Sequence, residues 1–276
     1  MFTPVSISGK FFKKYLSMNS HPAKIRIQNI IGKKFFSAGI ILQNENEVSF
    51  KLSANDWITR TMILHGDYEP NSTMLAKNIL KNGGVLLDIG ANFGLFTCIA
   101  ARHNEKVKVF AVEPNYKIIQ RLLDNINRNN LQNRVQVINT ALSEKIQSVS
   151  LEQPYSDNLG TTVTKPDTSS ILCILSCPLE FIFSEYKIDT AVLLKIDIEG
   201  NEFEVLKNFP FEKYKINNIL IEFNHLSKRS FEEMNSFFIS KNFKSYTISG
   251  IELRTDNQPI PENNIWFVNQ HLIKLQ

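Results

Sequence analysis

The sequence predicts an α/β fold in which a mostly parallel, doubly wound sheet carries helices on both faces. From residue 85 onward, short apolar runs alternate with segments whose apolar residues recur at helical spacing. Runs such as "VLLDIG" (85–90) are apolar at consecutive positions, which is typical of strands buried on both faces of a parallel sheet. Such alternation implies right-handed crossovers and a ligand site beyond the carboxyl ends of the strands.

The regular part of the chain can be divided into strands and helices by these two periodicities. Strands are expected over 85–90, 107–114, 134–142, 191–200 and 217–224. Helices are expected over 95–102, 115–130, 201–209 and 230–242, and the segments 243–249 and 264–270 could close the sheet as a final pair. The polar stretch 152–170 indicates loops around short strands, where an insertion over a ligand site could lie.

Residues 1–80 are less regular, and we expect them to form an N-terminal extension that packs on a core domain of residues 81–276. A short basic helix, a hairpin over 39–52 around "QNENE", and a helix over 72–80 capped by Ser72 or Thr73 are predicted. Lysines gather in "KFFKKYL" (10–16) and "GKKFF" (32–36). These two segments could form a membrane or polyanion footprint, although a solvated helix face is the simpler interpretation.

Composition narrows the class of protein. With 276 residues, 43% of them hydrophobic, and a net charge of +4, the chain has ample material for a globular core. No apolar stretch approaches the roughly 18 to 20 residues of a membrane helix, so we expect a cytoplasmic protein without stable membrane insertion. No nucleic-acid partner is expected, and the sequence leaves the oligomeric state open. Three scattered cysteines suit a reducing compartment.

The segment "VLLDIGANFG" (85–94) ends an apolar run with an acid and then turns through glycines. Gly90 permits a tight turn, and Gly94 allows a helix or a ligand to approach the backbone closely. The spacing is G-x-x-x-G, whereas a dinucleotide site has G-x-G-x-x-G, and Asp88 would repel a pyrophosphate. An acid at this position suits a ligand with a cationic amino group, which disfavours a nicotinamide-dependent oxidoreductase.

The second strand ends at Glu113, about 25 residues after Asp88 and directly before Pro114. A carboxylate at this position can accept both hydroxyls of a ribose. A cationic amino group at the first strand and a ribose at the second together describe S-adenosylmethionine. The alternative is that Asp88 and Glu113 merely cap helices.

These motifs resemble those of the FkbM-type S-adenosylmethionine-dependent methyltransferases. The resemblance spans roughly residues 60–225 in the order of that family. It is carried by "GDYEP" (66–70), "LDIGANFGLFT" (87–97), "VEP" (112–114), "ALSE" (141–144), "SDNLG" (156–160), "LKIDIEGNEFEVLK" (194–207) and "IEFN" (221–224).

The resemblance implies a Rossmann-like, seven-stranded class I methyltransferase fold and a methyl acceptor that is a hydroxyl oxygen of a sugar, glycan or small metabolite. It places Asn92 with the glycine turn around the methionine part of the cofactor, although Asn92 could instead be a helix cap. Thr140 and Ala141 would flank the adenine. The expected cofactor site comprises Asp88, Gly90, Ala91, Asn92, Gly94, Glu113, Pro114, Thr140, Ala141 and Asp197.

Candidate catalytic groups follow the fourth and fifth strands, where Asp197, Glu199 and Glu222 lie. If the strand continues to Glu199, this residue and Asp197 share a face and raise each other's proton affinity, as a general base near neutral pH requires. Two alternatives remain open. Glu199 could be only the N-terminal acid of the next helix, or the three acids could hold Mg²⁺.

Other polar residues near the expected site have weaker signals. His225 follows the fifth strand and His65 precedes "GDYE", so either could be the base. Tyr68 and Glu69 could close over the acceptor, and Lys195 could pair with one of the acids. A further alternative for the whole chain is a non-catalytic protein that binds the cofactor or acts as an interaction module.

Overall fold

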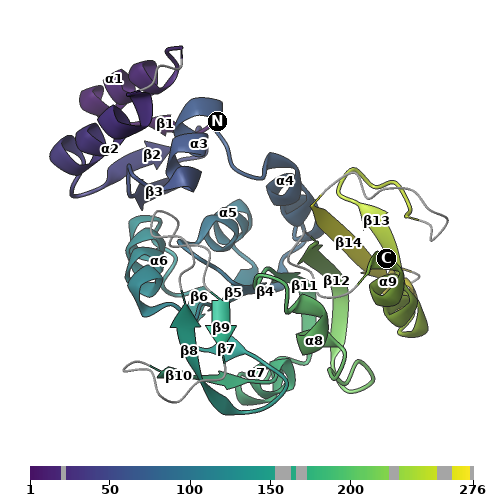
Figure 1. The fold of residues 1–276 in the computed structure, drawn as a ribbon. Helices are drawn as coiled ribbons and strands as arrows, with labels where there is room; N and C mark the ends of the chain where they lie inside the picture. The colour runs from purple at the N-terminus through teal and green to yellow at the C-terminus, as the bar shows by residue number, and fades with distance from the viewer. Residues whose placement is uncertain (20–22, 153–162, 166–172, 224–229, 254–262, 274–276) are drawn as a thin grey trace.

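The computed structural model describes residues 1–19, 23–152, 163–165, 173–223, 230–253 and 263–273 (Figure 1). In these residues a sheet of seven strands has the order β13-β14-β12-β11-β4-β5-β6. The five strands β12, β11, β4, β5 and β6 are parallel, and β14 runs antiparallel to both of its neighbours. The strands are β4 (Gly84–Ile89), β5 (Val107–Val112), β6 (Val135–Ile138), β11 (Thr190–Ile196), β12 (Lys215–Glu222), β13 (Phe243–Thr247) and β14 (Asn264–Asn269).

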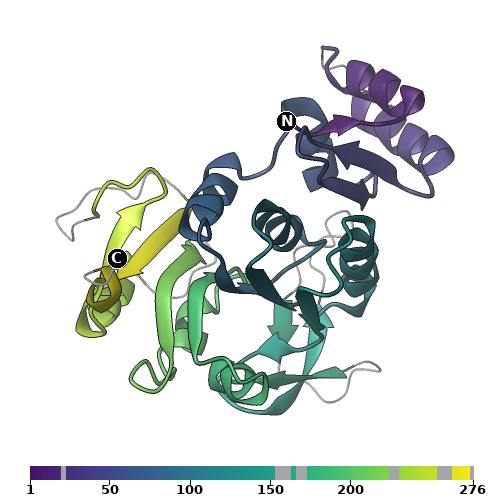
Figure 2. The same ribbon diagram turned by 180° about the vertical axis from the view of Figure 1, so that it is seen from behind.

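Helices cover both faces of this sheet (Figures 1 and 2). Leu86 packs in one hydrophobic cluster and its neighbour Leu87 in the other, because successive strand residues point to opposite faces. The first cluster includes α4 (Pro70–Ile79), α5 (Leu95–His103) and α6 (Tyr116–Arg128); the second includes α7 (Leu179–Glu185), α8 (Glu202–Leu206) and α9 (Phe231–Ser240). The predicted doubly wound α/β sheet of seven strands is confirmed. A short α10 (Gln270–Ile273) follows β14.

Two local predictions are wrong. The third strand does not run through 134–142, because β6 ends at Ile138 and β7 (Ala141–Leu142) pairs with another sheet. The helix expected to start at a Ser72 or Thr73 cap begins at Pro70, whose fixed φ suits the first helical position. Thr73 instead donates its hydroxyl to the Pro70 carbonyl oxygen from inside the first turn.

A second sheet lies beside the first, in the region where the sequence indicated loops around short strands. Its order in the described residues is β7-β10-β8-β9. The additional strands are β8 (Gln147–Glu152), β9 (Val163–Lys165) and β10 (Cys173–Cys177), and α7 after β10 was also not predicted. Residues 153–162 and 166–172 of the polar stretch lie outside the described residues.

Residues 1–66 form what we call the N-terminal module. It contains the antiparallel sheet β1-β2-β3, and the hairpin expected over 39–52 corresponds to β2 and β3. The sequence suggested one basic helix, whereas two helices precede the hairpin and α3 follows it. The elements are β1 (Thr3–Pro4), α1 (Ile7–Leu16), α2 (Lys24–Phe35), β2 (Ile40–Gln43), β3 (Ser49–Leu52) and α3 (Trp57–His65).

Strand β3 docks the module onto α6 through two buried asparagine side chains. The backbone amide of Lys51 donates to Asn125 Oδ1 at 2.8 Å, and that of Ser49 donates to Asn129 Oδ1 at 2.9 Å. Asn129 also donates to the Ser49 carbonyl oxygen at 2.8 Å. These bonds satisfy backbone groups at the edge of β3.

Within the described ranges, no helix combines the length and apolar character needed to span a bilayer.

Candidate functional site

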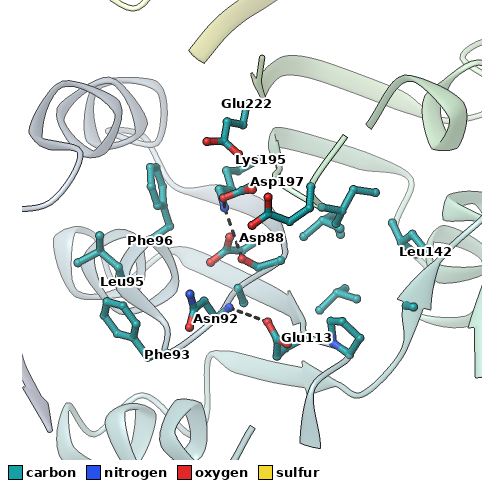
Figure 3. Close-up of a pocket in the computed structure, with 18 of the residues that line it drawn as sticks. Asp88, Asn92, Phe93, Leu95, Phe96, Glu113, Leu142, Lys195, Asp197 and Glu222 are labelled. Atoms are coloured by element: carbon teal, nitrogen blue, oxygen red, sulfur yellow. Dashed lines mark hydrogen bonds and ion pairs between the residues drawn. The ribbon is translucent and has the colours of Figure 1, made fainter. Parts of the chain in front are cut away.

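A pocket lies beyond the carboxyl ends of β4, β5, β11 and β12 (Figure 3). This is the edge at which ligands bind in open α/β sheets, at the point where the strand order reverses. Strand β4 lies between β5 and β11, so the turns after β4 and β11 meet at this point. Figure 3 shows the acidic side chains in a row, from Glu222 through Asp197 and Asp88 to Glu113.

The turn after β4 is held tightly against the end of β11. Gly90 has φ of 76°, and a Cβ at this position would lie 1.9 Å from the Asp197 carbonyl oxygen. The Asp197 amide donates to the Ile89 carbonyl oxygen at 3.1 Å, which joins the two strand ends. Only glycine allows both this backbone conformation and this close approach.

Asn92 occupies a left-handed conformation, with φ of 52°, that asparagine tolerates better than most residues. It does not cap α5, because Gly94 is the N-cap residue of that helix, so the helix-cap alternative for Asn92 is wrong. The Asn92 amide donates to Glu113 Oε2 at 2.9 Å instead. The turn thus orients the acid of the neighbouring strand.

Asp88 is buried at the end of β4 and lines the pocket. Its Oδ2 accepts a hydrogen bond from the Thr97 hydroxyl at 2.6 Å, whereas its Oδ1 is buried and has no hydrogen-bond partner among the described residues. Burial raises the pKa of Asp88, and the nearby charge of Lys195 opposes that rise. A buried carboxylate oxygen without a partner is costly, so this atom fits a cationic group of a bound ligand.

Glu113 is buried at the end of β5 with a fixed orientation. Its Oε2 accepts the Asn92 amide, and its Oε1 accepts the Asn115 amide at 2.8 Å. Burial raises the pKa of Glu113 to about 7, despite both of these hydrogen bonds. Each oxygen keeps a further lone pair, so an ionised Glu113 can accept two more hydrogen bonds from a diol.

The remaining cofactor residues predicted from sequence also lie at this pocket, except for Gly94. Gly94 is set back as the N-cap of α5, where a Cβ would lie 2.7 Å from Leu122 Cδ1. Thr140 and Ala141 line the side of the pocket where the chain leaves β6 for β7, and the Thr140 hydroxyl donates to the Leu175 carbonyl oxygen at 2.8 Å. Ala91, Pro114 and Asp197 also line it.

A buried cation stands between the acids at the other end of the pocket. Lys195 Nζ lies 3.1 Å from Asp197 Oδ2 and 5.4 Å from the centre of the Phe96 ring. Burial opposes the charge of Lys195, but Asp197, Asp88 and Glu69 together hold its pKa above the usual range. The ammonium is therefore ionised and neutralises part of this acidic cluster.

Asp197 and Glu222 form a hydrogen-bonded pair of carboxyl groups across β11 and β12. Burial opposes ionisation of Asp197, but the charge of Lys195 and the bond from Glu222 keep its pKa below the ordinary value. Burial and the charge of Asp197 raise the pKa of Glu222. Glu222 therefore keeps the proton and donates a hydrogen bond to an ionised Asp197.

Glu199 lines the pocket from the turn after β11, not from a position within the strand as predicted. Strand β11 ends at Ile196, and Glu199 has φ of 59°, so the expected alternation with Asp197 along a strand is wrong. Both acids nevertheless line the pocket. Burial and the charges of Asp197 and Glu202 raise the pKa of Glu199 to about 7.

Glu202 has the local role that was the alternative for Glu199. It is the first residue of α8, and its Oε1 accepts the amides of Ile198 at 2.8 Å and Gly200 at 3.1 Å. These bonds pair backbone donors of the loop between β11 and α8. Glu202, not Glu199, is thus the acid that stands in the first turn of α8.

Further residues line the pocket beside the acids. Tyr68 and Glu69, which were expected to close over an acceptor, are among them, and Asn264 Nδ2 donates to Glu69 Oε2 at 3.3 Å. Trp57 and Ile58 of α3 also line it and were missed. Trp57 is 58% exposed, and its ring stands edge-on to that of Tyr68, with ring centres 6.0 Å apart.

Some candidates do not reach the pocket in the structure. His65 is exposed at the end of α3 and does not line the pocket, and His225 lies outside the described residues. Among the described side chains, no group of three or more His, Cys, Asp or Glu residues is arranged to hold a metal ion. The Mg²⁺ alternative thus has no support from the geometry.

The strand order, the glycine turn and the two buried acids at neighbouring strand ends match what the sequence resemblance implied for a class I S-adenosylmethionine-dependent methyltransferase. The methyltransferase FkbM domain model matches residues 88–245, which is more than half of the chain. The chain belongs to this family.

Individual relatives are distant. Hexuronic acid methyltransferase AglP of Haloferax volcanii is 28% identical over 174 residues, which are 63% of this chain and 69% of that protein. The O-methyltransferase from Bacillus cereus, solved with SAH, is 12% identical with a TM-score of 0.45, over 77% of this chain and 87% of that one. TrmK from M. capricolum, solved with S-adenosyl-homocysteine, is 16% identical with a TM-score of 0.42, over 71% of this chain and 66% of that one.

Proposed function

We propose that this protein transfers a methyl group from S-adenosylmethionine to a hydroxyl oxygen of a sugar, a glycan or a related small metabolite. The observation that carries the proposal is the position of Glu199. Its carboxyl group, with a pKa of about 7, lines the same pocket as the glycine turn, Asp88 and Glu113. A hydroxyl acceptor needs such a base, whereas a more acidic nucleophile does not.

The cofactor would be held by the β4 and β5 ends of the pocket. The unpartnered Oδ1 of Asp88 would accept its amino group, and the oriented carboxylate of Glu113 would accept its ribose hydroxyls. Thr140 and Ala141 would flank the adenine, beside Ala91 and Pro114. When bound, S-adenosylmethionine supplies an electrophilic methyl group, so the protein has only to position the acceptor and manage its proton.

Glu199 would take the proton of the acceptor hydroxyl as the oxygen attacks. It suits this role better than Asp197, because a base works best when its pKa is near the operating pH. Asp197 is committed to Lys195 and Glu222, and this hydrogen-bonded group would hold the acceptor side of the pocket in place. Lys195 would keep the cluster of acids from repelling one another.

Trp57 and Tyr68 would form the acceptor wall. Their rings meet edge-on at the pocket, and the larger part of Trp57 is exposed. A rigid aromatic face of this kind offers contact area to the apolar side of a sugar ring at low entropic cost. The curated relative is named for hexuronic acid, which supports a sugar as the acceptor class.

The test is a methyl-transfer assay with S-adenosylmethionine and a panel of uronic-acid-containing and neutral glycans, with the product located by mass spectrometry. We expect a methyl ether on one class of sugar hydroxyl, formed by the wild type and by an exposed control variant, Glu105→Gln. Glu199→Gln should bind S-adenosylhomocysteine normally and turn over far more slowly. Calorimetric binding of S-adenosylhomocysteine without any transfer would favour the non-catalytic alternative, and methylation at nitrogen would contradict the hydroxyl acceptor.

A further inference from the structure

The net positive charge of the chain comes from its N-terminal segment, residues 1–36. Residues 1–36 contain no acidic residue, whereas the rest of the chain has 24 basic and 27 acidic residues and is net negative. A separation of charge of this kind is typical of a segment that binds a polyanionic partner. The basic residues of this segment are Lys10, Lys13, Lys14, Lys24, Arg26, Lys33 and Lys34.

These basic side chains are not used within the molecule to balance acids. In the part of the chain that the structure describes, none of them forms an ion pair. Lys24 donates to the Met18 carbonyl oxygen, and Lys34 lies over its neighbour Phe35. Their positive charge is therefore available to a partner outside the chain.

Large apolar side chains are exposed in the same segment. Of the nineteen exposed large hydrophobic side chains in the described residues, nine lie within residues 1–36. Scattered exposed apolar residues are normal, but a concentration of them marks an interaction surface. The nine are Met1, Val5, Ile7, Phe11, Met18, Ile25, Ile27, Ile30 and Phe35.

Helix α1 combines both kinds of residue on its outer face. Its buried side, with Phe12 and Leu16, packs into the N-terminal module. At 3.6 residues per turn, the opposite side carries Ile7 and Phe11, which are 75% and 66% exposed, next to Lys10 and Lys14. The outer face is thus an apolar pair flanked by a basic pair.

Helix α2 repeats this arrangement. Gln28 and Gly32 mark its buried side. The opposite side carries Ile30, which is 52% exposed, with Ile27 beside it. The same face includes Arg26, Lys33 and Lys34. Both helices lie at the end of the molecule farthest from β12 and β13 (Figures 1 and 2).

We propose that the outer faces of α1 and α2 bind the surface of an anionic lipid membrane. Lysine and arginine side chains are attracted to anionic headgroups, while isoleucine and phenylalanine side chains enter the boundary between headgroups and acyl chains. A nucleic acid would use the positive charge but would leave Ile7, Phe11 and Ile30 exposed to water. The binding is peripheral, since these helices lie on the surface of a folded module.

The test is co-sedimentation of the full chain with vesicles of phosphatidylcholine alone or of phosphatidylcholine mixed with phosphatidylglycerol. We expect binding to the mixed vesicles that weakens with added salt, and little binding to phosphatidylcholine. The charge-reversed variant Lys10→Glu/Lys14→Glu and the apolar variant Phe11→Ser/Ile30→Ser should each bind at least tenfold more weakly. The matched control Lys81→Glu/Lys108→Glu, with the same net charge as the first variant, should bind like the wild type.

Each contrary result would overturn the proposal. The proposal would be wrong if the wild type did not sediment with the mixed vesicles. It would also be wrong if the control Lys81→Glu/Lys108→Glu weakened binding as much as Lys10→Glu/Lys14→Glu, because binding would then depend only on net charge. Unchanged binding by Phe11→Ser/Ile30→Ser, or capture by RNA with no binding to vesicles, would indicate a different polyanion. Calorimetry with S-adenosylhomocysteine verifies that each variant is folded, and it reports on the pocket independently of the membrane.

Discussion

The pocket has two halves that are built in different ways. The half that we propose for the cofactor (the cofactor half) contains Asp88 and Glu113 at two neighbouring strand ends, and backbone amides of the adjoining turns orient Glu113. The half that we propose for the acceptor (the acceptor half) contains Trp57 of the N-terminal module, Asp197 and Glu199 after β11, and Glu222 of β12. Backbone geometry therefore preorganises the first half, whereas interactions among buried side chains organise the second.

Lys195 links the two halves electrostatically. It pairs with Asp197 at 3.1 Å, and its charge also acts on Asp88, Glu69 and Glu113. A buried charge left without its partner is strongly destabilising, so this cation and its acids have to be present together. We therefore expect a change in either half to have a distinct signature, because we propose that one half binds the cofactor and the other handles the acceptor.

The largest expected effect comes from the acceptor half. Glu199→Gln should lower kcat by about 10²- to 10⁴-fold, the usual contribution of a positioned base, and leave the affinity for S-adenosylhomocysteine unchanged. Because a base acts in its ionised form, the wild-type kcat should rise with pH and level off above a pKa of about 7. The pH profile of the variant should lack this rise. An unchanged profile in the variant would exclude Glu199 as the base.

The second largest effect is expected in the cofactor half, on the affinity for S-adenosylhomocysteine. Glu113→Gln should weaken S-adenosylhomocysteine binding about 100-fold, because hydrogen bonds to a charged group contribute roughly 1.5 to 3 kcal/mol. Burial holds the pKa of Glu113 at about 7, so wild-type affinity should fall as pH drops below that value and the carboxylate becomes protonated. Titration calorimetry at several pH values measures both, with Glu105→Gln as the exposed control. Equal affinity of Glu113→Gln and wild type would mean that Glu113 does not contact the ribose.

The smallest effect sharpens the role of the N-terminal module. Trp57→Ala should raise the KM for a sugar acceptor about tenfold, from the loss of an aromatic contact of roughly 1 kcal/mol or more, and should not change cofactor affinity. Phe181→Ala removes an aromatic ring of α7 that is 43% exposed and does not line the pocket, and it serves as the matched control. If Trp57→Ala changed the affinity for the cofactor but not the KM for the acceptor, Trp57 would belong to the cofactor half instead of the acceptor half.

Local patterns were enough to predict much of the core. Consecutive apolar residues identified the strands around Asp88 and Asp197, and helical spacing identified α5, α6 and α9, because both patterns record burial at a regular period. Patterns failed where context decided the structure. The split of the third strand after Ile138 and the second sheet depend on partners that are distant in the sequence, whereas the helix start at Pro70 follows a local signal, the fixed φ of proline.

The sequence by itself determined the buried strands, the glycine turn and the acids at the strand ends, because these depend on residues that are neighbours in the chain. Only the tertiary structure decided that a protonated Glu222 meets an ionised Asp197, that Glu199 leaves the strand, and that Trp57 joins the pocket. These features depend on distances and burial between segments far apart in the chain. Such distances also set the pKa values, since the energy of a charge depends on what surrounds it in space.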